Sequence, residues 1–308
     1  MILHHYPTSP FAEKIRLIFG YKNIAWQGVL IPMVMPKPDL MPLTGGYRKT
    51  PVLQIGADIY CDTALICDVL EHIAPTPSLY NNASKGLVRS LAQWADTLLF
   101  PVAMAYNFQP KGAQHVMATM PEDVVKMFAD DRKAMRGGGA RMPAADATAM
   151  YKSHLRRISS MLEDHAFLLG DTPCLADFSV YHSVWFTIAK VPVIDSILDA
   201  TPLVREWANR MAVYGHGQEQ TISASQAIEV AKATQPAPLT DDVFQDEHGL
   251  PLGTQVTVAA DSFGTEPTAG KLVAATRTRL SLERNDPLTG TVHVHFPRMG
   301  FIMKKADA

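Results

Sequence analysis

The sequence has few cysteines, little net charge and no long hydrophobic run, and each shortage excludes a class of protein. Its three cysteines, Cys61, Cys67 and Cys174, include no CxxC pair. This argues against a disulfide framework and a zinc knuckle and favours a reducing compartment. A formal net charge of −2 gives no electrostatic basis for binding nucleic acid or an anionic membrane. No signal peptide and no run of about 18 apolar residues is visible, so we expect a cytoplasmic protein.

The composition that is present describes a folded chain of more than one domain. The 308 residues are 47% hydrophobic and 19% charged, which permits a sizeable core. Residues 2–6 read as a short strand, and apolar side chains then recur at helical spacing from residue 11 to 19. Two apolar runs flank Gly56-Ala57 as in a hairpin, and a second helical face follows at 66–73. The order strand, helix, loop, hairpin, helix predicts one compact α/β unit over residues 1–80.

The middle and the end of the chain have different patterns. Residues 85–235 read as almost wholly helical, and 176–190 is apolar around most of its circumference, as in a helix buried within a bundle. The glycines at 137–139 have no preceding strand and no following GK[ST], so we interpret them as an inter-helix loop. After a linker that begins at Gln235, alternating runs over 250–303 predict four or five short antiparallel strands in a small barrel or sandwich.

One helix start allows two interpretations. Ser9 precedes Pro10, and serine is a favoured N-cap while proline favours the first helical position. Ser9 then caps, Pro10 starts the helix and Phe11 is buried. The same N-terminus also carries free N–H groups and about half a positive charge, which favours a thiolate over a thiol. The Ser9 hydroxyl could then donate to the sulfur of a bound thiol, and the local pattern does not decide between the two.

Two further stretches of the sequence also allow both a structural and a functional interpretation. Thr50-Pro51 begins a strand after the basic pair Arg48-Lys49, and its peptide bond could be trans or cis. Asp62 or Thr63 could cap the next helix, or the N–H groups there could hold a substrate carboxylate.

Taken together, these stretches resemble the glutathione transferase superfamily. SPFAEKIRL (9–17) looks like its first-helix signature, and TPVL (50–53) looks like its cis-proline strand. CDTALICDVLE (61–71) is similar to its acidic-then-hydroxyl helix start, and LLGDTPCLADFSV (168–180) resembles the buried helix start of its second domain. The motifs occur in the family's order and cover about two thirds of the chain.

The resemblance implies an α/β thioredoxin-like domain followed by an all-α helical domain. We expect the glutathione-binding domain at 1–80, the helical substrate domain at 85–220 and a helical extension and linker at 221–240. A small antiparallel β appendage at 241–308 has no place in the ordinary family pattern. The family also implies a two-fold homodimer.

The resemblance also assigns roles by position. Ser9 would face the glutathione sulfur, and Thr50 would offer its backbone to the cysteinyl part beside a cis Pro51. Asp62 and Thr63 would hold the γ-glutamyl end. Arg48 or Lys49 would meet the glycyl carboxylate. Because a serine cannot form a mixed disulfide, Ser9 points to thiolate stabilisation and away from covalent thiol transfer.

Two functions follow as hypotheses. The first is a glutathione-dependent transferase, with glutathione as co-substrate and no metal, that conjugates or reduces a small hydrophobic electrophile or a peroxide in detoxification. Its second-substrate pocket would be lined by Phe11, Met104, Tyr106 and Phe108, each of which could equally be core. The alternative is a non-catalytic, transferase-like binding or interaction scaffold that uses the C-terminal β domain.

A pair of histidines in the appendage also allows two interpretations. His293 and His295 are two residues apart in an alternating run, so they share one face of a strand. An HxH metal site is conceivable there. Without a third ligand nearby in the sequence, we expect two solvent-facing histidines.

Overall fold

The structure is a computed structural model that describes residues 1–80, 83–239, 243–245 and 247–306. Its strands are β1 (Ile2–His5), β2 (Ala25–Leu30), β3 (Val52–Ile55), β4 (Asp58–Cys61), β5 (Gln218–Thr221), β6 (Gln255–Ala260), β7 (Thr268–Ala275), β8 (Arg279–Asp286), β9 (Gly290–Pro297) and β10 (Phe301–Lys305). Hydrogen bonds join them into one sheet in the order β10-β6-β7-β8-β9-β4-β3-β1-β2-β5.

The N-terminal part is the predicted α/β unit. Its helices are α1 (Pro10–Tyr21), the short α2 (Met41–Thr44) and α3 (Thr63–Ile73). Strands β3 and β4 form the predicted hairpin around Gly56, which has a positive φ of 61° that glycine adopts without strain. Strand β1 lies between β2 and β3, parallel to the first and antiparallel to the second. Ile15, Ile18 and Leu70 of helices α1 and α3 are buried in one core with residues of the sheet and of the helical part.

The middle of the chain is helical, as predicted. Its helices are α4 (Lys85–Trp94), α5 (Phe100–Asn107), α6 (Pro110–Met117), α7 (Glu122–Met135), α8 (Ala144–Met161), α9 (Leu175–Trp185), α10 (Pro202–Ala212) and α11 (Ala224–Lys232), with π-helical turns η1 (Ala95–Leu99) and η2 (Phe186–Lys190) and a 3₁₀ segment η3 (Pro192–Leu198). Helix α9 is buried over Leu175–Val184, as the apolar pattern predicts. None of the helices in the described ranges combines the length and the hydropathy needed to cross a bilayer.

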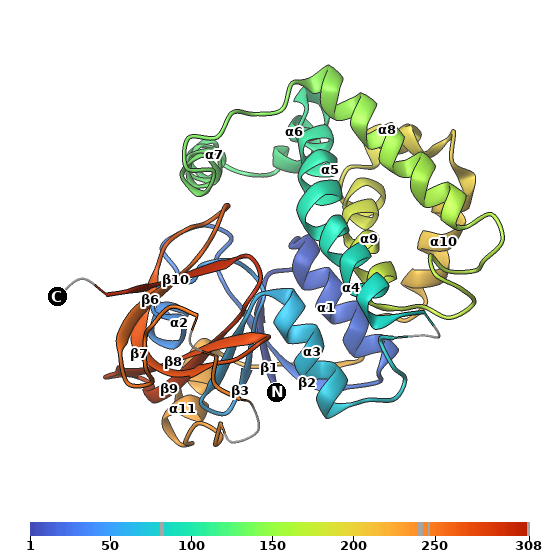
Figure 1. The fold of residues 1–308 in the computed structure, drawn as a ribbon. Helices are drawn as coiled ribbons and strands as arrows, with labels where there is room; N and C mark the ends of the chain where they lie inside the picture. Colours follow the sequence, from blue (N-terminus) through green and yellow to red (C-terminus); the bar gives the residue numbers. More distant parts are fainter. Residues whose placement is uncertain (81–82, 240–242, 246, 307–308) are drawn as a thin grey trace.

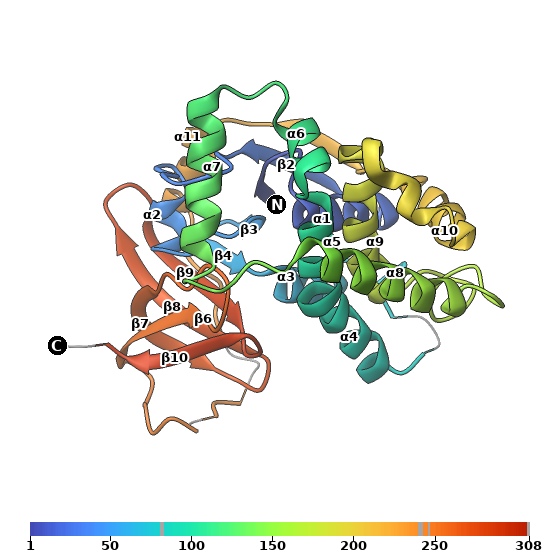
Figure 2. The same ribbon diagram turned by 90° about the horizontal axis from the view of Figure 1, so that it is seen from above.

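Helix α7 lies apart from the other helices of the middle region. Figures 1 and 2 show it at the end of two extended connections, against the side of the molecule that carries the sheet. The loop that follows it contains the three glycines. Gly137 and Gly138 have positive φ values of 57° and 86° within a turn, which confirms the predicted inter-helix loop.

The C-terminal strands are antiparallel to one another, as predicted, but they continue the N-terminal sheet. Strand β9 runs parallel to β4, with Asp58 opposite His293 and Ile59 opposite Val294. Their apolar side chains share a second core with β1 and β3, from Ile2 and Val52 to Phe296. The predicted boundary between linker and appendage, at residues 240 and 241, lies outside the described residues.

Three expectations need correction. The loop expected after the first helix contains β2, and the region expected to be helical contains β5, which pairs with β2 in parallel. The histidines expected to face solvent do not: His295 is fully buried and the His293 side chain is 12% exposed. They are covered because β9 pairs with a strand from the opposite end of the chain.

Candidate functional site

The first helix begins as the Ser-Pro pattern predicts. Ser9 has an extended backbone, and its Oγ accepts a hydrogen bond from the Ala12 N–H at 3.2 Å. Pro10 occupies the first turn, where no N–H is needed. Ser9 is 2% exposed, so its hydroxyl lies within the protein at the positive end of α1. The cap is therefore confirmed.

A second hydroxyl lies near Ser9. The Arg132 guanidinium on α7 donates to the Tyr6 hydroxyl at 3.4 Å. Burial raises the pKa of the Tyr6 phenol, while Arg132 and a hydrogen bond with the Ser9 hydroxyl act in the opposite direction. The end of β1 and the start of α1 thus place Tyr6 and Ser9 together. Sequence reasoning missed Tyr6 because it reads as the last residue of a strand.

Two cations, Arg132 and Lys37, lie near Tyr6, and a third, Arg48, lies next to Lys37. Lys37 Nζ donates to the Arg48 carbonyl oxygen at 2.9 Å and to Thr50 Oγ1 at 3.0 Å, and it lies 6.0 Å from the Tyr6 ring. Burial lowers the pKa of Lys37 to about 8, and the charges of Arg132 and Arg48 add to this effect. Three positive charges held this close together favour the binding of an anion. Nothing in the sequence marks Lys37, which lies between two prolines in a loop.

Two carboxylates from distant parts of the chain pair with Arg48. Its guanidinium binds Asp131 of α7 and donates to Glu266 Oε1 at 2.6 Å. Arg48 is consequently only 8% exposed. Counting Lys37, Arg48 and Arg132 against Asp131 and Glu266, the group keeps one net positive charge. Neither α7 nor the appendage was expected to reach this position.

The residues between Arg48 and the start of β3 make contacts different from those of Arg48. The Thr50–Pro51 peptide bond is cis, as the resemblance implies. Lys49 points elsewhere than Arg48, because its Nζ lies 5.8 Å from the Tyr47 ring and 5.3 Å from the Phe301 ring of β10. Lys49 is thus in contact with the appendage.

The start of α3 lies above a buried ionic network. Asp62 caps α3 by accepting from the Ala64 N–H at 2.9 Å, with a positive φ of 74° that aspartate adopts more readily than most residues. Thr63 is buried, and its Oγ1 accepts from Lys14 Nζ at 3.2 Å. Lys14 also donates to Asp96 of η1 at 2.7 Å. The network therefore fixes α3 relative to α1 at the point where both helices begin.

The four residues predicted to line a second-substrate pocket have different neighbours. Phe11 packs against Phe100 and His182 at ring distances of 4.6 Å. Phe108 stacks on Phe128 of α7 at 5.9 Å. The Tyr106 hydroxyl donates to the Ile194 carbonyl at 2.8 Å, and Met104 packs at the edge of the main core. These contacts do not join the four into one lining.

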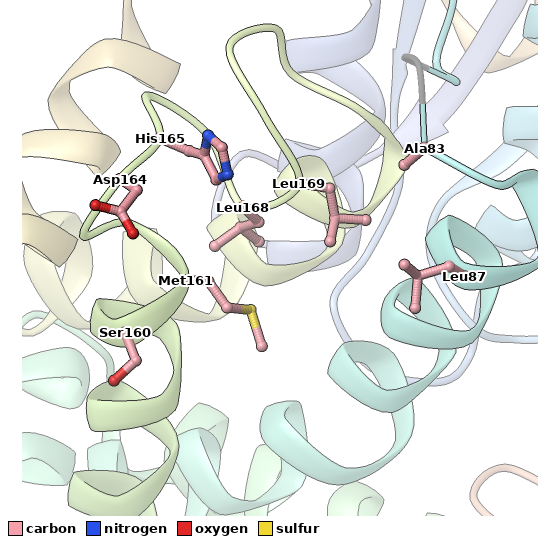
Figure 3. A pocket seen from close by; sticks show the side chains of 8 residues that line it. All are labelled: Ala83, Leu87, Ser160, Met161, Asp164, His165, Leu168 and Leu169. Atoms are coloured by element: carbon pink, nitrogen blue, oxygen red, sulfur yellow. The ribbon is translucent and has the colours of Figure 1, made fainter.

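A cavity of about 440 Å³ lies elsewhere, between the end of α8, the loop after it and the start of α4. In Figure 3, Met161, Leu169 and Leu87 line it from these three segments, and His165 and Asp164 are polar residues of the same lining. None of the residues predicted to bind glutathione belongs to it.

Comparison with known proteins supports the sequence motifs. A family model described as the glutathione S-transferase N-terminal domain matches residues 3–78. A solved GST-like protein from Pseudomonas syringae is 42% identical, with 99% of this chain and 98% of that chain covered and a TM-score of 0.83. Because that match spans almost the whole chain, it includes the C-terminal strands.

Two more distant proteins were also found. A solved glutathione S-transferase from Rhodospirillum rubrum F11 is 20% identical over 68% of this chain and 87% of its own, with a TM-score of 0.51, which shows the fold alone. FtsZ-localized protein A from Caulobacter vibrioides is 23% identical over 182 residues, which are 58% of this chain and 72% of that protein. The predicted fold class, a thioredoxin-like domain with a helical domain and C-terminal strands, is confirmed.

Proposed function

Because this chain belongs to the glutathione S-transferase superfamily, we propose that it binds glutathione at the N-terminus of α1 and uses the thiolate against a small hydrophobic electrophile or a peroxide. The observation that carries the proposal is the buried Ser9 hydroxyl, which caps α1 next to the Tyr6 hydroxyl, where Arg132 binds and over whose ring Lys37 lies. The helix start and this charge both favour an anionic sulfur.

The Ser9 hydroxyl can act as the donor to the sulfur. Its oxygen accepts from Ala12, and its proton, which here is shared with the Tyr6 hydroxyl, would turn to the sulfur when glutathione binds. Tyr6 offers a second hydroxyl nearby. A thiol whose pKa falls from about 8.5 toward 7 gains about tenfold in thiolate at neutral pH. The thiol proton passes to solvent, and the thiolate then forms a bond to the electrophilic carbon as the leaving group departs with its electron pair. With a peroxide it attacks one oxygen as the O–O bond breaks, the released oxygen takes a proton from solvent, and a second glutathione reduces the sulfenic acid to a disulfide and water.

The rest of glutathione follows the β3 edge. Thr50 offers its backbone beside the cis Pro51, and the Asp62 carboxylate faces the γ-glutamyl ammonium next to Thr63. We assign the glycyl carboxylate to Arg48 with Lys37 rather than to Lys49, because Lys49 lies against Phe301. A homodimer, a cytoplasmic location and a role in detoxification are part of the same proposal.

The test is glutathione binding to wild type and to two serine variants. We expect glutathione at millimolar concentration to raise the thermal midpoint of wild type, and Ser9→Ala to bind it with a higher thiol pKa and a lower turnover of a generic electrophile. Ser223→Ala is the matched control, because Ser223 caps α11 with the same 3.2 Å hydrogen bond far from the site. Full turnover by Ser9→Ala would make Ser9 a cap alone.

One observation favours a second candidate, a non-catalytic binding or interaction scaffold that uses the C-terminal β domain. Asp131 of α7 and Glu266 of the appendage already pair with Arg48, the cation assigned to glutathione. If millimolar glutathione stabilises neither wild type nor Asp131→Asn, in which that pairing is weakened, the scaffold becomes the better proposal.

A further inference from the structure

Three metal-ligating side chains meet where the C-terminal strands join the N-terminal sheet. Asp58 lies on β4, and His293 and His295 lie on the adjoining β9, with Asp58 directly opposite His293 in the parallel register. One ligand atom from each lies within 4.8 Å of the other two. Asp58 Oδ1 is 2.9 Å from His295 Nε2 and 3.9 Å from His293 Nδ1.

The three side chains are sheltered from solvent to different degrees. His295 and Asp58 are 0% and 5% exposed, and the ring of His295 stacks on Tyr60 at 4.6 Å. His293 is 12% exposed and lies nearer the surface. A ligand that reaches the group would therefore enter on the side of His293.

Neighbouring polar groups hold the two histidine rings and the Asp58 carboxylate in their orientations. Ser281 Oγ lies 2.8 Å from His295 Nδ1, and the second Asp58 oxygen accepts from the Ala237 N–H at 2.8 Å. Glu283 Oε2 lies 3.9 Å from His293 Nε2. Hydroxyl and carboxylate groups on the far nitrogens of histidines are the usual second layer of a metal site, where they fix the ring orientation.

Hydrogen bonds among these side chains do not account for the burial of one ring nitrogen. Within the part of the chain that the structure describes, His293 Nδ1 is buried and makes no hydrogen bond, although it points toward Asp58. The neutral imidazole ring is the form that binds metals. Lys271 pairs with Glu283, and Arg279 lies close enough to act on both rings, so two cations balance the two carboxylates.

We propose that Asp58, His293 and His295 bind a divalent transition metal, Zn²⁺ above all, through Asp58 Oδ1, His293 Nδ1 and His295 Nε2. Two imidazoles and one carboxylate suit Zn²⁺, with a fourth position for water. The Ser281 hydroxyl can accept from His295 Nδ1 once Nε2 turns its lone pair to the metal. The metal would fasten β9 to β4 and so join the C-terminal strands to the transferase part of the sheet.

The test measures metal binding without glutathione, so its failure is distinct from that of the proposed function. Protein purified without a polyhistidine tag is titrated with Zn²⁺ and with Co²⁺, whose visible absorption reports nitrogen and oxygen ligands. We expect one ion per chain and a higher thermal midpoint with Zn²⁺ that chelator reverses. His293→Ala should weaken binding by at least about tenfold, since removing even an outer group commonly costs this much.

Two variants keep the result interpretable. His165→Ala is the matched control, because His165 is an exposed histidine whose Nδ1 lies 3.8 Å from Asp171; it should bind the metal as wild type does. Asp58→Asn keeps the shape and the bond from Ala237 if His293→Ala does not fold, and it should also bind weakly. Failure of wild type to take up an ion, or equal binding by His293→Ala and His165→Ala, would overturn the proposal.

Discussion

Lys14, near the start of α1, is a buried cation balanced by the Asp96 carboxylate at 2.7 Å. Asp96→Asn would leave the ammonium buried without its counter-charge. We expect urea unfolding to show a loss of about 3 kcal/mol in the free energy of unfolding. Lys14→Met combined with Asp96→Asn should lose less than the two single changes added together. A loss below about 1 kcal/mol for Asp96→Asn would contradict a stabilising pair.

The same carboxylate gives stability a dependence on acid. Burial raises the pKa of Asp96, but the charge of Lys14 and the hydrogen bonds from His182 and Lys14 outweigh it, so the net pKa lies below its usual value. A depressed pKa contributes stability that is present at neutral pH and is lost as the pH falls below about 4. Asp96→Asn should therefore lose less stability than wild type does over that range.

His4 and His5 make the stability of the fold depend on pH in a less acidic range. Burial lowers the pKa of each to about 4, and for His5 the charge of Arg16 adds to the effect. The unfolded chain takes up protons below about pH 6.5 while the folded chain does not, so stability falls from there toward pH 4.

Each histidine should contribute a slope of about 1.4 kcal/mol per pH unit within that window. Urea unfolding at a series of pH values measures this slope, and His4→Leu should remove the part of the slope that His4 contributes. A wild-type stability that is flat from about pH 6.5 down to about 4.5, which lies within that window, would be inconsistent with buried neutral rings.

At the scale of elements, α7 contacts all three parts of the molecule. Phe128 stacks on Phe108 of α5, Arg132 reaches Tyr6, and the Met135 carbonyl accepts from Gly264 of the appendage at 2.9 Å. Asp131 lies on the same helix and pairs with Arg48. The helix thus covers the cations assigned to glutathione, and its release would expose them.

This position predicts that Asp131 of α7 competes with glutathione for Arg48. Asp131→Asn weakens the hold on Arg48 and should tighten the dissociation constant for glutathione about fivefold, or by about 1 kcal/mol, in calorimetric titration. Asp130→Asn changes the exposed neighbour on α7 and controls for the lost charge. Equal affinities for the two variants would show that α7 does not compete for Arg48.

The elements that sequence reasoning found are those with their own pattern. The apolar spacing of α1, the hairpin at Gly56 and the buried α9 are local, and the structure has all three. Strand β2 has no clean alternation and contains Gly28, while β5 is polar and exposed at every position. Both exist because a neighbouring strand pairs with them, which no local window contains.

At the scale of the whole molecule, one sheet joins the two ends of the chain. Deleting residues 236–308 would uncover the hydrogen-bonding edge of β4 and the apolar side chains, Ile59 among them, that pack against β9. We expect the shortened chain to aggregate, because an exposed edge with apolar neighbours pairs with other chains. Size-exclusion chromatography measures this. A soluble shortened chain of unchanged thermal midpoint would mean that the C-terminal strands are an independent appendage.

The same topology explains which parts of the sites the sequence could predict. Ser9, Pro51 and Asp62 follow a family pattern in which each motif is continuous, so their positions could be inferred. The partners of Arg48 come from α7 and the appendage, and His295 meets Asp58 across 237 residues of sequence. Such pairs follow from the packing of whole units, and the alternation around His293 could not show which strand would cover it.

The most direct test of the central claim is the pKa of the glutathione thiol when it is bound to this protein. Thiolate ultraviolet absorption, followed against pH at saturating glutathione, measures it for wild type, Ser9→Ala and the control Ser223→Ala. We expect a value nearer 7 than the usual value of about 8.5 in wild type and Ser223→Ala, and a higher one in Ser9→Ala. Absence of binding, or the same thiol pKa in all three proteins, would contradict thiolate stabilisation by Ser9 at the start of α1.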